Sequence, residues 1–187
     1  DILLYDATHV PVGDDQKQHL ELCRDIAQKF NNDFEVDNFL RVPEPLIQKE
    51  FSRIMSLKDG LKKMSKSELS DNSRINLTDE KDEIISKIKK AKTDSLPLPT
   101  NKEELERRPE AKNLIGIYSS LTGIKLEKSI EKFSGKNFSE FKDELSNEVV
   151  EKISPISYEI KKLLQNKDYL DEIVINGCEK ANEISSK

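Results

Sequence analysis

The first part of the chain changes from a strand-like to a helix-like spacing of hydrophobic residues. The run from His9 to Val12 is short and β-branched and ends at Gly13, which predicts a strand that leaves into a turn. Between residues 15 and 30, apolar residues recur at intervals of three and four, as one buried helix face requires. Asp14 or Asp15 can cap this helix.

The next segment predicts a crossover unit. Residues 31–48 are interrupted by Pro43 and Pro45 and are predicted to form a loop, and residues 53–57 supply a second short strand. Strand, helix, loop and strand predict a right-handed parallel crossover between the two strands. Residues 58–73 are rich in lysine, serine and aspartate and are predicted to be a long loop.

The rest of the chain is predicted to be helical. A helix over residues 78–92 begins in a polar run that offers N-cap oxygens and is ended by Pro97 and Pro99. No apolar repeat occurs between residues 95 and 109, which predicts a linker and the internal boundary. Further apolar stripes predict helices over residues 114–123, 145–164 with a kink at Pro155, and 173–184.

Composition and charge narrow the class of protein. The 187 residues include 31 Lys and Arg against 36 Asp and Glu, so a uniformly basic nucleic-acid binder is disfavoured and any polyanion site must be local. Cys23 and Cys178 lie far apart, which favours a reducing compartment over a disulfide framework or structural zinc site. No apolar run approaches the roughly 18 residues of a membrane span. We therefore predict a cytoplasmic protein without membrane contact.

The strongest local motif is Lys63-Met64-Ser65-Lys66-Ser67. With Lys58 and Lys62 nearby, it predicts a flexible loop that can close over a polyphosphate. Ammonium groups on long stems suit that role because negative charge moves onto the leaving pyrophosphate in the transition state. On charge alone, a solvated lysine-rich loop remains the alternative.

The second motif is the turn from Val10 to His19, between the predicted strand and helix. Gly13 allows backbone to approach a ligand, and amides at a helix N-terminus with a nearby Asp can bind a nucleotide. An ordinary turn with an N-cap carboxylate is the alternative.

Together and in this order, the two motifs resemble the C-terminal part of the tryptophanyl-tRNA synthetase family. The likeness includes residues 1–5, 53–57 and 92–95 and covers essentially the whole chain. Tyrosyl-tRNA synthetases share the lysine-serine loop and a Gly-x-Asp-Gln turn. They lack the Val-Pro-Val-Gly lead and the Lys-Gln-His continuation, so they are the second choice.

The resemblance implies a fold, an activity and partners. The fold class is α/β and mostly α overall: the second half of a Rossmann-type nucleotide-binding fold (residues 1–95), followed by an all-helical bundle that binds the anticodon (residues 96–187). The activity is ATP-dependent activation of tryptophan to the adenylate and its transfer to tRNA(Trp). ATP enters with Mg²⁺ as a substrate complex, no prosthetic group is expected, and the parent enzyme is a homodimer.

The resemblance also implies roles for individual residues. Asp1 accepts a hydrogen bond from the tryptophan indole, Val10 and Val12 line the indole pocket, and Gln16 reaches the α-amino end. The predicted catalytic lysines are Lys63 and Lys66, and no metal-binding residue is predicted. The residues predicted to bind ATP are Gly13, Asp14, Asp15, Ile54, Lys63, Met64, Ser65, Lys66 and Ser67, with Asp15 on the ribose and Ile54 touching adenine through its backbone.

The sequence also departs from the family pattern. Gly60 follows Asp59, and Glu68 and Leu69 follow Ser67, where the family usually has Asp-Pro. No His-x-Gly-His or Thr-x-Gly-Asn type motif occurs, and the chain begins with Asp rather than Met. We therefore expect a segment of a longer protein that does not catalyse adenylation alone.

A non-catalytic tRNA-binding or helical interaction module is the alternative from another class. The lysines at 87, 89, 90 and 92 could hold RNA phosphates, although a solvated helix face is favoured.

Overall fold

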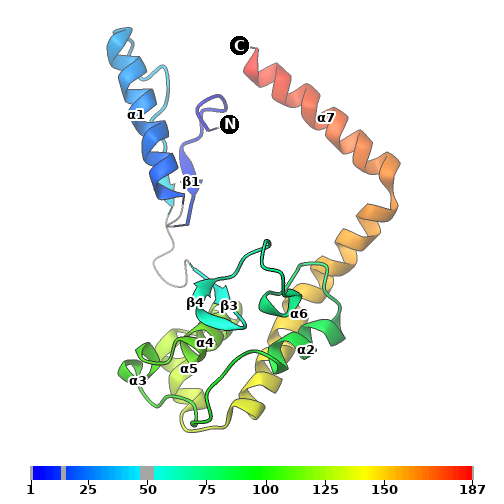
Figure 1. The fold of residues 1–187 in the computed structure, drawn as a ribbon. Helices are drawn as coiled ribbons and strands as arrows, with labels where there is room; N and C mark the ends of the chain where they lie inside the picture. The colour runs from blue at the N-terminus through cyan, green and yellow to red at the C-terminus, as the bar shows by residue number, and fades with distance from the viewer. Residues whose placement is uncertain (1, 14–15, 47–52, 187) are drawn as a thin grey trace. The chain divides into compact units, whose positions relative to one another are not determined.

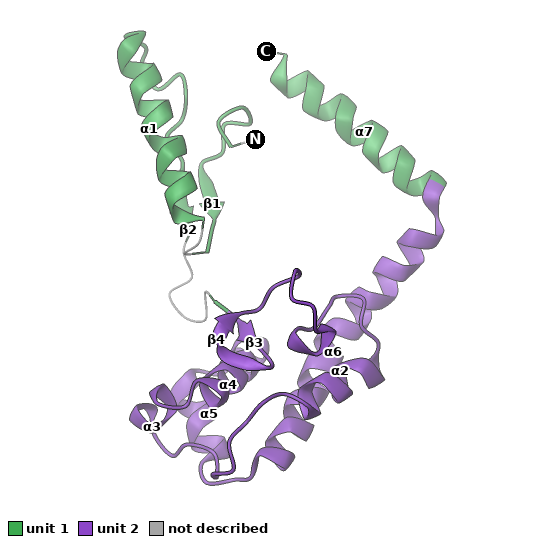
Figure 2. Cartoon of the chain, in the orientation of Figure 1, with its two compact units in different colours: residues 1–53, 168–187 green, residues 54–167 purple. Residues whose placement is uncertain are grey.

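The computed structural model describes residues 2–13, 16–46 and 53–186 (Figure 1). The chain forms two compact units, one of residues 1–53 and 168–187 and the other of residues 54–167, called unit 1 and unit 2 below (Figure 2). Most described residues are helical, and the strands form two small two-stranded sheets.

Unit 1 contains a parallel strand pair joined by a helix. Strand β1 (His9–Pro11) is followed by helix α1 (Lys17–Asp33) and strand β2 (Glu44–Leu46). The strands pair with His9 opposite Glu44, and the pairing continues where the amide of Val12 donates to the Leu46 carbonyl at 3.2 Å. A parallel crossover unit is therefore present, but it does not join the two strands that were predicted.

The predicted partner strand was wrong. β1 pairs with β2, in the segment predicted to be a loop, and not with residues 53–57. Pro45, one of the two prolines that led to the prediction of a loop, lies at the centre of β2. The proline is tolerated because the neighbouring residues supply hydrogen bonds between the two segments. The Glu44 amide donates to the Thr8 carbonyl at 2.8 Å, and the Leu46 carbonyl accepts from the Val12 amide.

Helix α1 confirms the predicted amphipathic helix. Leu20 and Ala27 are its buried residues, and the Asn31 side chain closes the following loop by bonding both the amide and the carbonyl of Leu40, at 2.9 and 2.8 Å. Gln16 is the N-cap residue and makes no side-chain capping bond. The predicted caps, Asp14 and Asp15, lie outside the described residues. Helix α7 (Lys167–Ser185), also assigned mainly to unit 1, has no buried residue.

Unit 2 begins with an antiparallel hairpin of β3 (Met55–Ser56) and β4 (Asp59–Lys63). The prediction of one continuous loop over residues 58–73 was therefore wrong, because the segment contains β4 and a short 3₁₀ helix, η1 (Asp71–Ser73). The last three residues of β4, Leu61, Lys62 and Lys63, are all exposed, so none of them packs into the core. The strand therefore lacks the alternation of buried apolar and exposed polar residues by which a strand is recognised in a sequence.

Helices build the hydrophobic core of unit 2. They are α2 (Lys81–Lys89), α3 (Lys102–Glu106), α4 (Pro109–Thr122), α5 (Leu126–Phe133) and α6 (Phe138–Gln165). Helix α2 packs on α6, and α4 contacts α5, α6 and β4. At the centre, the rings of Phe133 and Phe141 meet edge to face with centroids 4.7 Å apart, beside the buried Tyr118. This core also takes in Leu57 and Leu98.

Local signals explain where these helices begin and end. Glu80 and Glu83 form a capping box at the start of α2, as the polar run before it predicted. Helix α4 begins with Pro109 and ends at Gly123, whose φ of 70° is left-handed. Helix α6 continues through Pro155.

The predicted linker over residues 95–109 is more ordered than its composition indicated. It contains α3, which is capped by the Asn101 side chain, and Leu98 and Leu105 are fully buried. The predicted boundary at residue 95 falls inside unit 2. The division into a nucleotide-binding part and an anticodon-binding part stays a prediction.

No helix in the described part of the chain is long and apolar enough to cross a membrane.

Replacing Gly60 with alanine should destabilise unit 2. A Cβ atom at residue 60 would lie 2.6 Å from the Glu110 nitrogen and from the Pro109 carbonyl carbon, both backbone atoms at the start of α4. We expect Gly60→Ala to lower the free energy of unfolding by about 1–3 kcal/mol, measured by chemical denaturation. Gly177→Ala is the control, because a Cβ there meets nothing within 4 Å. Equal stability of the two variants would contradict the close approach.

Candidate active site

The predicted lysine-serine loop begins where β4 ends. Lys63 is the last residue of the strand, and the Met64 amide donates to the carbonyl of Ile54, the residue before β3, at 3.0 Å, which fixes the first residue of the loop. The Asn113 side chain of α4 holds β3 in turn, since it accepts from the Met55 amide at 2.9 Å and donates to the Met55 carbonyl at 2.8 Å. The loop therefore starts from a rigid position.

Within the loop, serine side chains turn the chain. The hydroxyl oxygens of Ser65 and Ser67 lie 2.8 Å apart, and the Ser67 amide donates to the Ser65 hydroxyl at 3.3 Å. Such local side-chain to backbone bonds favour a tight turn. Lys66 lies between the two serines and is exposed. Its ammonium group has no ion-pair partner among the described residues.

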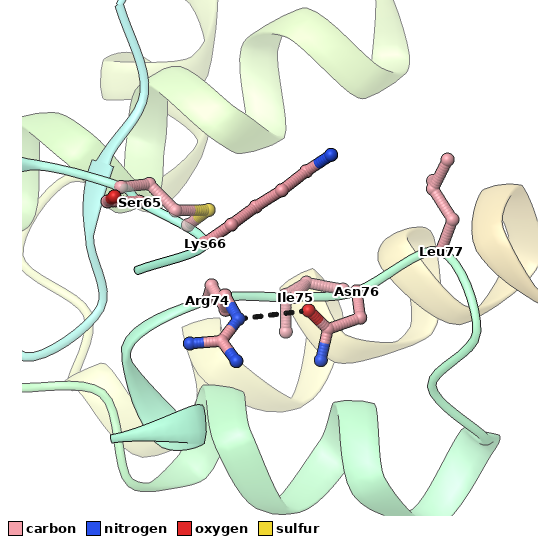
Figure 3. A pocket seen from close by; sticks show the side chains of 7 residues that line it. Ser65, Lys66, Arg74, Ile75, Asn76 and Leu77 are labelled. Atoms are coloured by element: carbon pink, nitrogen blue, oxygen red, sulfur yellow. Dashed lines mark hydrogen bonds between the residues drawn. The ribbon is translucent and has the colours of Figure 1, made fainter. Parts of the chain in front are cut away.

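Lys66 lies over a pocket of about 490 Å³ (Figure 3). Met64, Ser65 and Lys66 line it from the loop, and the segment from Arg74 to Leu77 lines it from the opposite side. In Figure 3 the Lys66 side chain is extended, while Arg74 and Asn76 face each other below it, with Arg74 Nε donating to Asn76 Oδ1 at 3.0 Å. Two cationic side chains, Lys66 and Arg74, and the polar side chains of Ser65 and Asn76 therefore line the pocket, which suits an anionic ligand.

An ion-pair network around the buried Lys87 anchors the far end of this loop. Lys87 of α2 is 6% exposed and bonds Asp71 of η1 at 2.5 Å and Asp79 at 2.6 Å. Burial lowers the pKa of Lys87, but its hydrogen bonds to the two carboxylates outweigh this effect and raise that pKa above its usual value. The hydrogen bond from Lys87 is also the main reason that the pKa of Asp71 lies below its usual value.

Other predicted site residues lie in unit 1. Val10 and Val12 are both half-buried, and residues two apart on an extended chain share one face, as a common pocket wall requires. The Gln16 side-chain oxygen lies 3.2 Å from Nδ1 of His19. Gly13 lies between the end of β1 and the start of α1. The predicted residues Asp1, Asp14 and Asp15 lie outside the described residues.

The structure therefore brings Met64, Ser65 and Lys66 together in one pocket and keeps Ile54 next to the loop. The carbonyl oxygen of Ile54 accepts a hydrogen bond from the Met64 amide. A backbone contact with adenine would therefore use the Ile54 N–H or the second lone pair of that oxygen. The roles assigned to these residues by resemblance stay predictions.

Sequence reasoning missed Arg74 and Asn76 as pocket residues. The available signal was the polar run from Ser70 to Asn76 directly after the loop. Polar runs are typical of solvated loops, so the pattern alone does not separate a structured pocket wall from an ordinary connection.

The lysine cluster near the end of α2 is largely paired within the chain. Lys87 is buried between Asp71 and Asp79, and it therefore does not lie on a solvated face. Lys89 lies 3.1 Å from Asp143. Lys92 lies 2.9 Å from Glu110. These contacts argue against the cluster as a phosphate-binding patch.

Comparisons with known proteins show what the chain is similar to. The family model described as tRNA synthetases class I (W and Y) matches residues 1–154. A tryptophan–tRNA ligase of Caulobacter vibrioides is 52% identical over 186 residues, which cover 100% of this chain and 54% of the relative. The chain thus spans about half the length of such relatives.

Solved structures give the same answer. Tryptophanyl-tRNA synthetase from Mycoplasma pneumoniae matches with a TM-score of 0.81 and 31% identity, over 99% of this chain and 54% of that one. The enzyme from Campylobacter jejuni in complex with ADP and tryptophan matches with a TM-score of 0.67 and 28% identity, over 100% and 56%. These matches confirm the predicted fold class, part of a Rossmann-type fold followed by helices.

Removing the buried cation should be costly unless its partner is removed as well. Lys87→Met leaves the Asp79 carboxylate, which is 7% exposed, without its counter-ion. We expect a loss of about 3 kcal/mol in the free energy of unfolding, because an unpaired buried charge is strongly unfavourable. The double variant Lys87→Met, Asp79→Asn should recover part of the loss. If the loss in the double variant equals the sum of the losses in Lys87→Met and Asp79→Asn, the two side chains do not interact and the pairing is contradicted.

The same network predicts a pH dependence at both ends. The lowered pKa of Asp71 stabilises the fold above the unfolded value of about 3.9, and this contribution is lost as the pH falls through the folded pKa. The raised pKa of Lys87 stabilises the fold below about pH 10.4, and this contribution is lost as the pH rises through the folded pKa. Denaturation curves of Asp71→Asn should be less sensitive to pH below about 4 than those of the wild type. Identical acid profiles would show that Asp71 is not paired.

Proposed function

The chain belongs to the class I tRNA synthetases for tryptophan and tyrosine, and from this premise we propose that it is part of a tryptophan–tRNA ligase. The observation that carries the proposal is the exposed Lys66 on a turn over a pocket lined by both polar and apolar side chains, in a chain that is 52% identical to a tryptophan–tRNA ligase. Those relatives carry the tryptophan name, so a tyrosine-specific enzyme and a non-catalytic module are not favoured.

The proposed reaction begins with ATP and tryptophan. An oxygen of the tryptophan carboxylate attacks the α-phosphorus of ATP, the bond from that phosphorus to the β-bridging oxygen breaks, and pyrophosphate leaves. The carboxylate is already ionised at neutral pH, so this step needs no general base, and positioning with charge stabilisation supplies the catalysis. In the second step the activated tryptophan is transferred to tRNA(Trp), and AMP is released.

The loop residues have complementary proposed roles in the first step. Lys63 and Lys66 stabilise the negative charge that develops on the pyrophosphate, and Mg²⁺ enters with ATP as part of the substrate. One hydroxyl of the Ser65–Ser67 pair donates to a phosphate oxygen while the bond between the two is intact, and the other can do so once that bond breaks. Their mutual hydrogen bond keeps both oxygens on one side of the turn, and only one of the two hydroxyls can donate within that pair.

Residues of unit 1 have proposed roles in binding the amino acid and the nucleoside. The half-buried side chains of Val10 and Val12 would contact the indole ring, and Gln16 would bind the α-amino group. Gly13 would let the backbone approach ATP. A site that supplies Asp1 as a partner for the indole N–H would reject analogues without that donor more strongly than an apolar pocket can.

Several broader inferences belong to the same proposal. Helices after residue 96 are proposed to bind the anticodon, and the parent enzyme is proposed to be a cytoplasmic homodimer.

Lys66→Ala in the full-length enzyme should reduce adenylate formation much more than tryptophan binding. The ammonium group is needed when charge moves onto pyrophosphate, so we expect kcat for pyrophosphate exchange to fall about 100-fold or more, with the KM for tryptophan little changed. Lys62→Ala is the matched control. Lys62 is a neighbouring, 73% exposed lysine whose recorded partner is Asp59 at 3.7 Å. Equal effects of the two variants on kcat, or a parallel rise in KM for Lys66→Ala, would overturn the proposal.

The isolated 187-residue chain should not form the adenylate. It spans about half the length of its relatives and contains no His-x-Gly-His or Thr-x-Gly-Asn type motif. Pyrophosphate exchange with ATP and tryptophan measures this directly. Sustained turnover by the isolated chain would contradict the expectation.

A further inference from the structure

Arg74 joins the end of the lysine-serine loop to the pocket wall. Its Nη1 group donates to the Glu68 carbonyl at 2.9 Å, one residue after Ser67. Its Nε group donates to Asn76 Oδ1 at 3.0 Å, and its Nη2 group lies 2.9 Å from Asp71 Oδ1. One guanidinium group therefore connects three separate points of the segment that follows β4.

The bond to Glu68 is important because the loop has few other attachments. Within residues 65–69, the remaining recorded hydrogen bonds of the described chain are local ones that start or end at Ser65. The next tie beyond the loop is the bond from Lys58 Nζ to the Ser70 hydroxyl at 3.3 Å. Without Arg74, the segment that carries Lys66 would be held only at Met64 and from Ser70 onward.

The environment of Arg74 indicates a positioning role instead of direct ligand binding. Its side chain is 18% exposed, and each of its three guanidinium nitrogens already has a partner within the chain. The fixed fork of a guanidinium can satisfy three acceptors at once, whereas the point charge of a lysine ammonium cannot reproduce that geometry.

Arg74 is also attached to a rigid element. Asp71 accepts from both Arg74 and Asn76, and it pairs with Lys87, which belongs to α2. Helix α2 packs on α6 in the core of the unit. The tie to Glu68 therefore runs back, through side chains with direct contacts, to the helical core.

We propose that Arg74 is a positioning residue for adenylate formation: by holding the Glu68 carbonyl, it restrains the turn that presents Lys66 to the leaving pyrophosphate. This inference rests on the proposed function. Restraining the loop in advance lowers the entropy lost when Lys66 meets its target in the transition state, so Arg74 acts on rate through Lys66.

The test is a double-mutant cycle in the full-length enzyme, with pyrophosphate exchange as the assay. Arg74→Ala should lower kcat about tenfold and leave the KM for tryptophan unchanged. In a Lys66→Ala background, Arg74→Ala should have no further effect, because the group that it positions is gone. Arg107→Ala is the matched control, since Arg107 is exposed and has no recorded side-chain bond in the described part of the chain. It should leave kcat unchanged.

Two outcomes would overturn the inference. An equal loss from Arg74→Ala in both backgrounds would show either direct phosphate contact or a general loss of structure. An unchanged kcat for Arg74→Ala in the wild-type background would show that the tie is not needed. If Arg74→Ala does not fold, Arg74→Lys, which keeps the charge but cannot reproduce the three-armed fork of the guanidinium, takes its place in the cycle with the same criteria.

A second readout separates this inference from the proposed function. Amide hydrogen exchange of residues 65–68 should become faster in Arg74→Ala and remain unchanged in Arg107→Ala. If exchange becomes faster in Arg74→Ala but the wild-type enzyme forms no adenylate, the restraint by the Arg74–Glu68 bond is supported. The proposed function, and with it the catalytic part of the inference, is then refuted. Unchanged exchange in Arg74→Ala would refute the tie itself.

Discussion

The burial of the Lys87 ammonium group determines the positions of the segments that surround the pocket. A charge removed from water costs several kcal/mol unless it is paired, so carboxylates must lie next to it. Asp79 comes from the segment just before α2, and Asp71 comes from η1. Once Asp71 is fixed at this position, Arg74 and Asn76 are fixed beside it, and one wall of the pocket is defined.

The lysine-serine loop is therefore a short segment between two rigid ends. At its start, the bond from Met64 to Ile54 ties it to a hairpin that Asn113 of α4 holds in place. At its end, the Asp71 network ties it to α2. Between these ends the exposed Lys66 can follow charge as it moves, while the ends prevent the loop from sampling most unproductive positions. Such a combination suits phosphoryl chemistry, in which catalysis comes mainly from positioning and charge.

Much of this architecture was predictable, because its signals are local and periodic. The faces of α1, α2 and α6 repeat every three to four residues, and the motif from Lys63 to Ser67 marks the loop by residue type alone. The failures have a common cause. Strand β2 contains a proline, β4 ends in three exposed residues, and α3 has only five residues, so pairing and packing, instead of pattern, determine them. The role of Arg74 depends on contacts with a carbonyl and two side chains, which no spacing reveals.

The central claim is that the turn between Met64 and Glu68 binds the phosphates of ATP. The most direct measurement is a crystal structure of the full-length enzyme with a non-hydrolysable ATP analogue and tryptophan. We expect Lys66 Nζ to lie within hydrogen-bonding distance, about 3 Å, of an oxygen of the β- or γ-phosphate. A complex with both ligands bound and ordered, but with Lys66 directed into solvent and no phosphate oxygen near the loop, would contradict the claim.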